Sequence, residues 1–154
     1  MDLIRYVDEV SSLRLLIMIE DVYLPSDRPA LLAVKAALHE PHLAIFNSWK
    51  GTDCCHNWYG VSCDQETHRV ADINLRGESE DAIFERAHRT GFISPEICKL
   101  SRLSSITIAD WKGITAQIPK CITRLPFLRI LDLIGNKISG QIPAGIGRLK
   151  RLTV

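Results

Sequence analysis

The stretch that decides the fold runs from residue 128 to residue 143 and reads LRILDLIGNKISGQIP. Its first half spaces leucines at 128, 131 and 133, and its second half ends in Gln-Ile-Pro. The same tripeptide occurs at residues 117–119, so its prolines lie 24 residues apart, and Pro95 lies another 24 residues upstream. A fixed period of this length indicates a chain built from repeated structural units.

The apolar pattern L-x-x-L-x-L recurs in phase with these prolines. Its three copies are Val70, Ile73 and Leu75, then Leu103, Ile106 and Ile108, then Leu128, Leu131 and Leu133. Each copy predicts a short strand whose alternate side chains point inward. One unit cannot bury its apolar row alone, so the units must stack. We therefore predict an α/β fold, a right-handed leucine-rich repeat solenoid with a parallel strand face.

The repeat contains a conspicuous bend residue and is interrupted at two places. Asn136 falls where the chain must bend, and its amide is expected to satisfy backbone groups that the bend would otherwise leave unpaired. The preceding copy is one residue longer in the stretch that contains Asp110 and Trp111. Lys112 therefore lies near the position that matches Asn136. The highly charged stretch from Arg76 to Phe92 separates the first two copies, and we expect it to leave the strand pattern as an insertion.

The residues before the repeats predict a helical cap. Ser26 followed by Asp27 and Pro29 favours a helix start, and Pro41 is expected to end that helix at about Glu40. Trp49 and Trp58 are expected to cover the open end of the coil. Further upstream, an apolar stripe from residue 3 to residue 17 favours a surface helix over a helix that binds a partner or a membrane surface.

Charge and hydropathy exclude several classes of function. Nineteen basic side chains face eighteen acidic ones, giving a net charge of +1, so the charge does not favour nucleic-acid binding. The longest uncharged apolar run covers residues 15–19, far below the ~20 residues that span a bilayer. That run is also too short for a secretory signal, and Asp2, Asp8 and Glu9 precede it, so no signal peptide is recognisable.

Specific motifs resemble a known family. The cap reads SDRPALLAVKAAL at 26–38 and DCCHNWYGVSCD at 53–64, and the repeats contain G-x-I-P at 140–143. The chain resembles plant extracellular leucine-rich repeat proteins. It is most similar to those labelled DNA-damage-repair/toleration-like, and polygalacturonase inhibitors and receptor-kinase ectodomains are more distant relatives.

The resemblance implies a domain layout and a location. Residues 1–22 form an atypical N-terminal segment, 23–68 a plant-type cap, and 69–154 about three repeats, the last incomplete, with the insertion at 76–92. The relatives carry about ten repeats, so the chain is expected to be truncated. They are extracellular or cell-wall proteins, which is the location that the resemblance implies here.

The adjacent cysteines of the cap admit three interpretations. Cys54, Cys55, His56 and Cys63 offer four zinc ligands, but adjacent cysteines seldom both reach one ion without strain. A reactive thiol would need an electropositive pocket, which this apolar loop does not suggest. A disulfide between Cys55 and Cys63 is favoured, since closing a nine-residue loop contributes about 2.5 kcal/mol. We therefore expect a structural bridge here, without metal or cofactor.

The other cysteines remain open. Relatives usually place a cysteine shortly before the cap helix to pair with Cys54, and residues 22–25 contain none. Cys98 and Cys121 lie 23 residues apart, so they belong to neighbouring turns. They can form a second disulfide, or remain as buried free thiols.

The strand face is the predicted binding surface. No motif for a catalytic nucleophile, a metalloprotease or a phosphate-binding loop is present, so we predict that the protein is not an enzyme. Outward positions of the strands form columns, and the candidate binding residues are Asp72, Asn74, Arg76, Ser105, Thr107, Arg129 and Asp132. This mixed polar surface suits a protein or cell-wall-associated ligand. The alternatives are a merely solvated sheet, a role in DNA-damage toleration, and a fragment without function.

Overall fold

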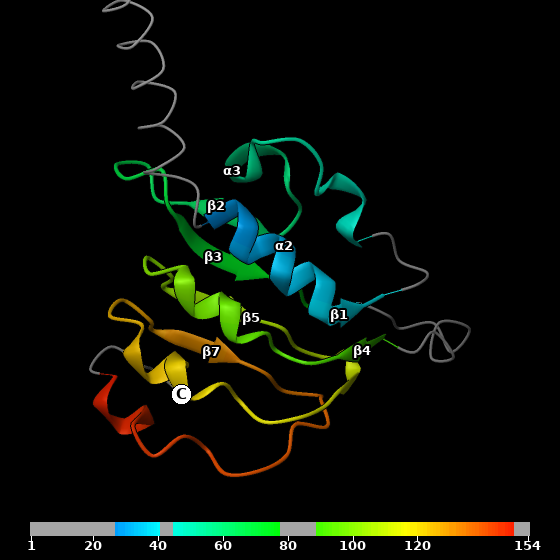
Figure 1. The fold of residues 1–154 in the computed structure, drawn as a ribbon, viewed down its shortest axis with the longest axis vertical. Helices are drawn as coiled ribbons and strands as arrows, with labels where there is room; N and C mark the ends of the chain where they lie inside the picture. Colours follow the sequence, from blue (N-terminus) through cyan, green and yellow to red (C-terminus); the bar gives the residue numbers. More distant parts are fainter. Residues whose placement is uncertain (1–26, 41–44, 78–88, 150–154) are drawn as a thin grey trace, which may run out of the picture.

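The chain passes repeatedly through three rows of short elements, as Figure 1 shows. The computed structural model describes residues 27–40, 45–77 and 89–149. The first row is a sheet of β2 (Val61–Cys63), β3 (Val70–Asn74), β5 (Ser105–Thr107) and β7 (Ile130–Asp132). The second is a sheet of β1 (Leu38–His39), β4 (Arg89–Gly91) and β6 (Lys112–Ile114). The third contains α2 (Asp27–Ala37), η3 (Pro95–Lys99), η4 (Lys120–Arg124) and η5 (Ile146–Arg148).

The first sheet has the register that the repeat predicts. Strands β3, β5 and β7 are parallel neighbours, and Ile73 pairs with Ile106, which pairs with Leu131. The prediction that the three apolar segments lie side by side in one sheet is therefore confirmed. Strand β2 joins the other edge antiparallel to β3, so the first repeat strand is covered by the cap.

The second sheet was not expected from the sequence. The prediction that residues 76–92 lie outside the strand pattern is wrong for Arg89–Gly91, because this segment forms β4. Strand β4 runs parallel to β6 with Thr90 opposite Gly113. The sheet satisfies backbone groups that a loop would leave to solvent. Residues 78–88 of the insertion lie outside the described residues, as do the predicted helix at 3–17, the expected N-cap Ser26 and the last residues, 150–154.

The cap helix α2 ends at Ala37 and not at about Glu40. Beyond it, Leu38 and His39 pair antiparallel with β4, and the Phe92 N–H donates to the Ala37 carbonyl. This pairing supplies partners for carbonyl groups that a longer helix would leave unsatisfied at its end. Gly91 makes the approach feasible, because its φ is +127° and a Cβ there would lie 2.1 Å from the Ala37 oxygen.

A buried ion pair joins the cap to the first repeat strand. The Asp27 side chain is only 4% exposed and accepts hydrogen bonds from Arg69 Nε at 2.8 Å and Nη2 at 2.7 Å. It also accepts the Val70 N–H at 3.0 Å. The hydrogen bond to Asp27 raises the pKa of Arg69. Asp27 is therefore more than a first-turn acid of the helix, because it fixes the position of α2 against β3.

The core lies between the three rows. The inward side chains of the first two repeat strands, including Ile73, Leu75 and Ile106, are fully buried. Trp49 and Trp58 stack with ring centroids 5.1 Å apart and are 2% and 3% exposed, which confirms their predicted place in the core. Their indole N–H groups donate to the carbonyls of Tyr59 and Lys50, so burial leaves no indole donor unpaired.

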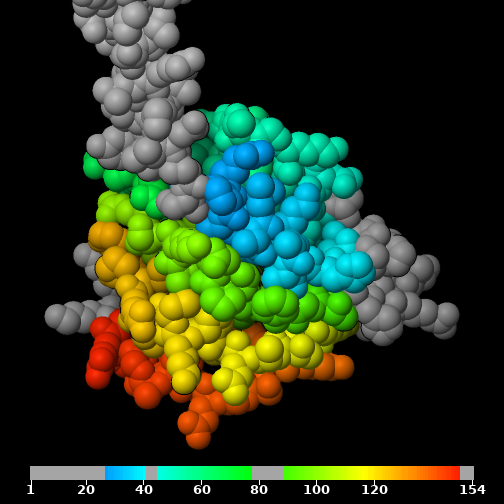
Figure 2. All heavy atoms as spheres, viewed as in Figure 1, coloured from blue at the N-terminus to red at the C-terminus, as the bar shows by residue number. Residues whose placement is uncertain are grey.

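The turns stack in chain order. In Figure 2 the colours follow one another in bands, from the blue and cyan cap through green and yellow to orange and red. Consecutive members of the helical row, η3, η4 and η5, are in contact. Within the described ranges, no helix is both long enough and apolar enough to cross a membrane.

Candidate ligand-binding surface

The strand registers assemble the predicted binding residues into columns. One column contains Asp72, Ser105 and Ile130, and the next contains Asn74, Thr107 and Asp132. Beyond the strands the ladder continues, since the Gly77 N–H donates to the Ala109 carbonyl. Thr107 differs from expectation, because it is only 9% exposed and offers little surface to a ligand.

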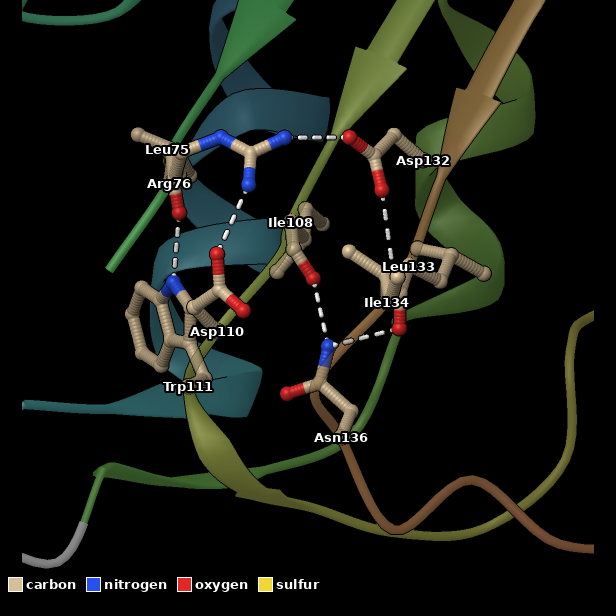
Figure 3. A network of polar contacts seen from close by, with 9 residues as sticks. All are labelled: Leu75, Arg76, Ile108, Asp110, Trp111, Asp132, Leu133, Ile134 and Asn136. Atoms are coloured by element: carbon tan, nitrogen blue, oxygen red, sulfur yellow. Dashed lines mark hydrogen bonds and ion pairs between the residues drawn. The ribbon is translucent and has the colours of Figure 1, made fainter. Parts of the chain in front are cut away.

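Arg76 crosses the face and joins three turns, as Figure 3 shows. Its guanidinium donates to Asp110 at 2.7 Å and also to Asp132. Asp132 in turn accepts the backbone N–H of Ile134 at 3.2 Å. The Arg76 side chain is 42% exposed, so solvent screens these pairs and their contribution to stability is small. Their main effect is to hold the guanidinium in one orientation.

Two side chains fix the backbone beneath this network. Asn136 Nδ2 donates to the carbonyls of Ile108 at 2.6 Å and Leu133 at 3.1 Å, which confirms the predicted role of its amide. The irregular Trp111 is buried and donates its indole N–H to the Leu75 carbonyl. Figure 3 shows all three bonds, of which those to Ile108 and Leu75 connect neighbouring turns directly. The face is therefore a firmly held platform.

A hollow of about 490 Å³ opens at the cap end of the face. Its walls are Tyr59, Gly60, Val61, Ser62, Asp72, Asn74, Arg76 and Ser105. The Tyr59 side chain is 52% exposed, while its backbone N–H donates to Ser48 Oγ at 2.8 Å. Gly60 has a φ of +75°, and a Cβ there would lie 2.3 Å from the Asn74 carbonyl oxygen. Only glycine therefore lets the cap approach β3 closely enough to form this wall.

Asp72 is the acidic group in the hollow. The side chain is half-buried, and partial desolvation raises the pKa of its carboxyl, while the charge of Arg129 opposes that shift. Among the described residues, its carboxylate forms neither a hydrogen bond nor an ion pair with a neighbouring side chain. Asp72 therefore differs from Asp132, whose carboxylate is paired.

The cysteines form two bridges and leave one thiol. Cys55 and Cys63 are joined within the cap, and Cys98 and Cys121 join η3 to η4. Cys54 is free and buried, and burial raises the pKa of its thiol. The sulfur atoms of Cys54, Cys55 and Cys63 lie within 4.8 Å of one another, but those of Cys55 and Cys63 are bonded to each other in a disulfide. This group therefore does not offer a set of thiolate ligands for zinc.

Only part of the hollow is predictable from the sequence. Of the predicted binding residues, Asp72, Asn74, Arg76 and Ser105 line it, whereas Thr107, Arg129 and Asp132 do not. The cap residues Tyr59 and Ser62 were missed, because the sequence did not indicate that β2 pairs with the edge of the repeat sheet. The dipeptide Tyr59-Gly60 carried the available signal, an aromatic residue beside a glycine at the junction with the repeats.

Comparison with known proteins places the chain among plant proteins of one architecture. Residues 24–64 match the family described as leucine rich repeat N-terminal domain. The DNA damage-repair/toleration protein DRT100 of Arabidopsis thaliana is 59% identical over 119 residues, which cover 74% of this chain and 32% of that protein. The polygalacturonase inhibitor of Vitis vinifera is 35% identical over 110 residues, covering 71% and 29%. The chain thus spans about a third of the length of these relatives.

Solved structures show the same fold. A plant ice-binding protein superposes with a TM-score of 0.70 at 28% identity, covering 84% of this chain and 38% of that one. The structure of the BIR3–SERK2 complex from Arabidopsis thaliana superposes with a TM-score of 0.64 at 27% identity, covering 80% and 63%. The fold described above is therefore that of plant leucine-rich repeat ectodomains, with short strands, few helices and disulfides.

Proposed function

The chain carries a leucine-rich repeat N-terminal domain and is a homologue of plant leucine-rich repeat proteins, and from this premise we propose that it is a non-catalytic recognition module. It binds a protein or a cell-wall-associated ligand through the strand face of a right-handed solenoid. The relatives include a protein named as an inhibitor of polygalacturonase and a structure solved as a complex of two proteins. Both names describe binding to another macromolecule.

The observation that supports this proposal best is the strand face itself, a firmly held platform with a hollow at its edge. The strands β3, β5 and β7 hold the partly exposed polar side chains of Asp72, Ser105 and Asp132 in fixed register, and Arg76 is oriented by two carboxylates. Side chains that are ordered before binding lose less entropy when a partner docks. A merely solvated sheet would not require this arrangement.

Homology to plant leucine-rich repeat proteins also supports a division of the chain into domains and a location outside the cell. Residues 1–22 form an N-terminal segment, 23–68 the cap, and 69–154 the repeats with an insertion that begins at residue 76. The protein acts outside the cell or in the wall, where the oxidising environment maintains the bridges of Cys55 with Cys63 and of Cys98 with Cys121.

Selection from a phage-displayed library of random dodecapeptides tests the proposal. Ser105→Arg inserts a large cation into the face and is expected to weaken binding of the selected peptides at least tenfold, measured by biolayer interferometry. Thr115→Arg is the matched control, because it inserts the same side chain at an exposed position in the same repeat, outside the face. Equal losses in both variants, or selected peptides that ignore Ser105→Arg, would contradict the proposal.

A second candidate function rests on the name of one relative. The 59% identity to a DNA damage-repair/toleration protein favours a role in tolerating DNA damage. The balanced charge of the chain opposes direct DNA contact, since such contact neutralises phosphates with clustered lysine and arginine. Fluorescence anisotropy with a 20-base-pair duplex distinguishes the two. Micromolar binding at physiological salt with a steep salt dependence would favour the DNA role, and its absence favours the recognition module.

A further inference from the structure

We propose that the hollow at the cap end of the strand face binds the cationic side chain of a lysine or arginine of the partner, with the Asp72 carboxylate as its counter-charge. The inference rests on the proposed recognition function and deepens it by naming the chemistry of one contact. The hollow is formed jointly by the cap residues 59–62 and the first two repeat strands.

Asp72 is the first reason. Its carboxylate is half-buried on β3 and, among the described residues, has no hydrogen-bond or ion-pair partner. Removing part of its hydration without supplying a partner costs free energy, which is why its pKa lies above the usual value. A carboxylate kept at such a cost in a hollow is suited to a ligand that supplies the missing donor.

Arg76 is the second reason, because its positive charge is already neutralised. Its guanidinium donates to the carboxylates of Asp110 and Asp132, on two later turns of the chain. Figure 3 shows both contacts directed along the face toward those turns. In the same wall as Asp72, an incoming anion would therefore meet a cation that is already paired with two carboxylates. This asymmetry favours a cationic guest over an anionic one.

The charge of the whole strand face agrees with this choice, while of its charged groups Asp72 and Arg76 are the two that line the hollow. The face carries the carboxylates of Asp72, Asp110 and Asp132, and the guanidinium groups of Arg76 and Arg129. The carboxylates outnumber the guanidinium groups. Arg129 acts on Asp72 only as a nearby charge that partly offsets its desolvation.

Tyr59 and the size of the hollow complete the site. A volume of about 490 Å³ lies within the usual range for pockets, roughly 300–1,000 Å³, and accommodates one long side chain. Tyr59 contributes an exposed ring, and its backbone is tied to both Ser48 and Trp49. An aromatic face within about 6 Å of a guanidinium or ammonium group adds a favourable cation–π contact. The hydroxyls of Ser62 and Ser105 add acceptors.

The test compares three blocked tripeptides that differ in one side chain. Arginine, lysine and citrulline are each placed between two glycines, and citrulline keeps the shape of arginine without its charge. We expect saturable backbone amide shifts at Tyr59, Ser62, Asp72 and Ser105 in NMR titrations with the two cationic peptides. The citrulline peptide is expected to bind at least fivefold more weakly. Equal binding of citrulline, or no shifts with any of the peptides, would overturn the proposal.

A pair of variants locates the charge. Asp72→Asn keeps the shape of the side chain and is expected to reduce the affinity for the arginine peptide at least fivefold. Glu66→Gln removes the same charge from an exposed cap position outside the hollow and is expected to leave the affinity unchanged. Equal losses would indicate only a general effect of net charge and would overturn the proposal. If library peptides bind the face in a Ser105-dependent manner while the arginine peptide fails, only this inference falls.

Discussion

The two ends of the described fold differ in how they bury the same sequence pattern. At the cap end, each row of the coil begins with one cap element, namely α2, β1 and β2. The inward residues Ile73 and Leu75 of the first repeat strand are consequently fully buried. In the last described turn, the equivalent residues Leu131 and Leu133 are only half-buried.

The difference shows that the burial of a repeat residue is set by its neighbouring turns and not by its own motif. Leu131 occupies the same register position as Ile106, which is fully buried between two turns. Ile134 and Ile142, further along the last described turn, are each 68% exposed. Stability in such a stack is therefore approximately a sum of contacts between adjacent turns. On this view, the cap end is the more strongly held of the two.

The largest expected effect comes from the ion pair that fixes the cap. Asp27→Ala leaves Arg69 without its carboxylate and the Val70 N–H without its acceptor. Breaking a buried pair and orphaning a backbone donor is expected to lower the free energy of unfolding by about 4 kcal/mol, measured by urea denaturation.

Asp132→Ala provides the comparison at the far end. Its ion pair with Arg76 is partly exposed to solvent, which screens it, so the expected loss is below about 1 kcal/mol. Similar losses in the two variants would contradict the view that the cap end is specially held.

The two disulfides sharpen the comparison, because one lies within the cap and the other joins two repeat turns. Replacing Cys98 and Cys121 by alanine opens a 24-residue loop, with an expected loss of about 3.5 kcal/mol from loop-closure entropy. Replacing Cys55 and Cys63 opens a nine-residue loop, with an expected loss of about 2.5 kcal/mol. Denaturation of both double variants in urea measures this order. The reverse order would indicate that the cap bridge stabilises by holding packing and not by closing a loop.

Equivalent core positions in two turns are expected to differ in what their truncation costs. Ile106→Ala creates a cavity in a fully buried layer and is expected to cost about 3 kcal/mol. Leu131→Ala removes a half-buried side chain in the same register and is expected to cost about half as much. Urea denaturation of the two variants checks the ratio. Equal costs would mean that the last described turn is as well covered as the middle one.

The repeat could be predicted from sequence because its signal is local and periodic. The spacing of Ile73, Ile106 and Leu131 predicted which segments pair, and the bend at Asn136 predicted a side-chain bond to the backbone. Both depend on short-range pattern and on the need to bury one apolar row.

The missed features depend on contacts between distant parts of the chain. Strands β4 and β6 have three residues each, RTG and KGI, without an alternation that would identify a strand. Asp27 and Arg69 are 42 residues apart, so their buried pair leaves no mark in the sequence. The wall that Tyr59 adds to the hollow likewise follows from the antiparallel docking of β2, which no periodicity encodes.

The smallest expected effects on the free energy of unfolding come from neutralising Asp72 at the cap end and Asp132 at the far end. The two effects are expected to have opposite signs. Burial raises the pKa of Asp72, so the ionised carboxylate is less favourable in the folded protein than in the unfolded one. The carboxylate therefore destabilises the fold at neutral pH, and this penalty disappears as the pH falls through the raised pKa and below the unfolded value, about 3.9. Asp72→Asn is expected to raise the free energy of unfolding at pH 7 by less than about 0.5 kcal/mol, and to change nothing near pH 3.

Asp132→Asn removes a paired charge and is expected to lower the stability slightly at pH 7. Urea denaturation of both variants at the two pH values measures the signs. A clear loss of stability for Asp72→Asn at pH 7 would mean that attraction to Arg129 outweighs the desolvation. The Asp72 carboxylate would then stabilise the fold itself, and its desolvation would no longer support a cation-binding site in the hollow.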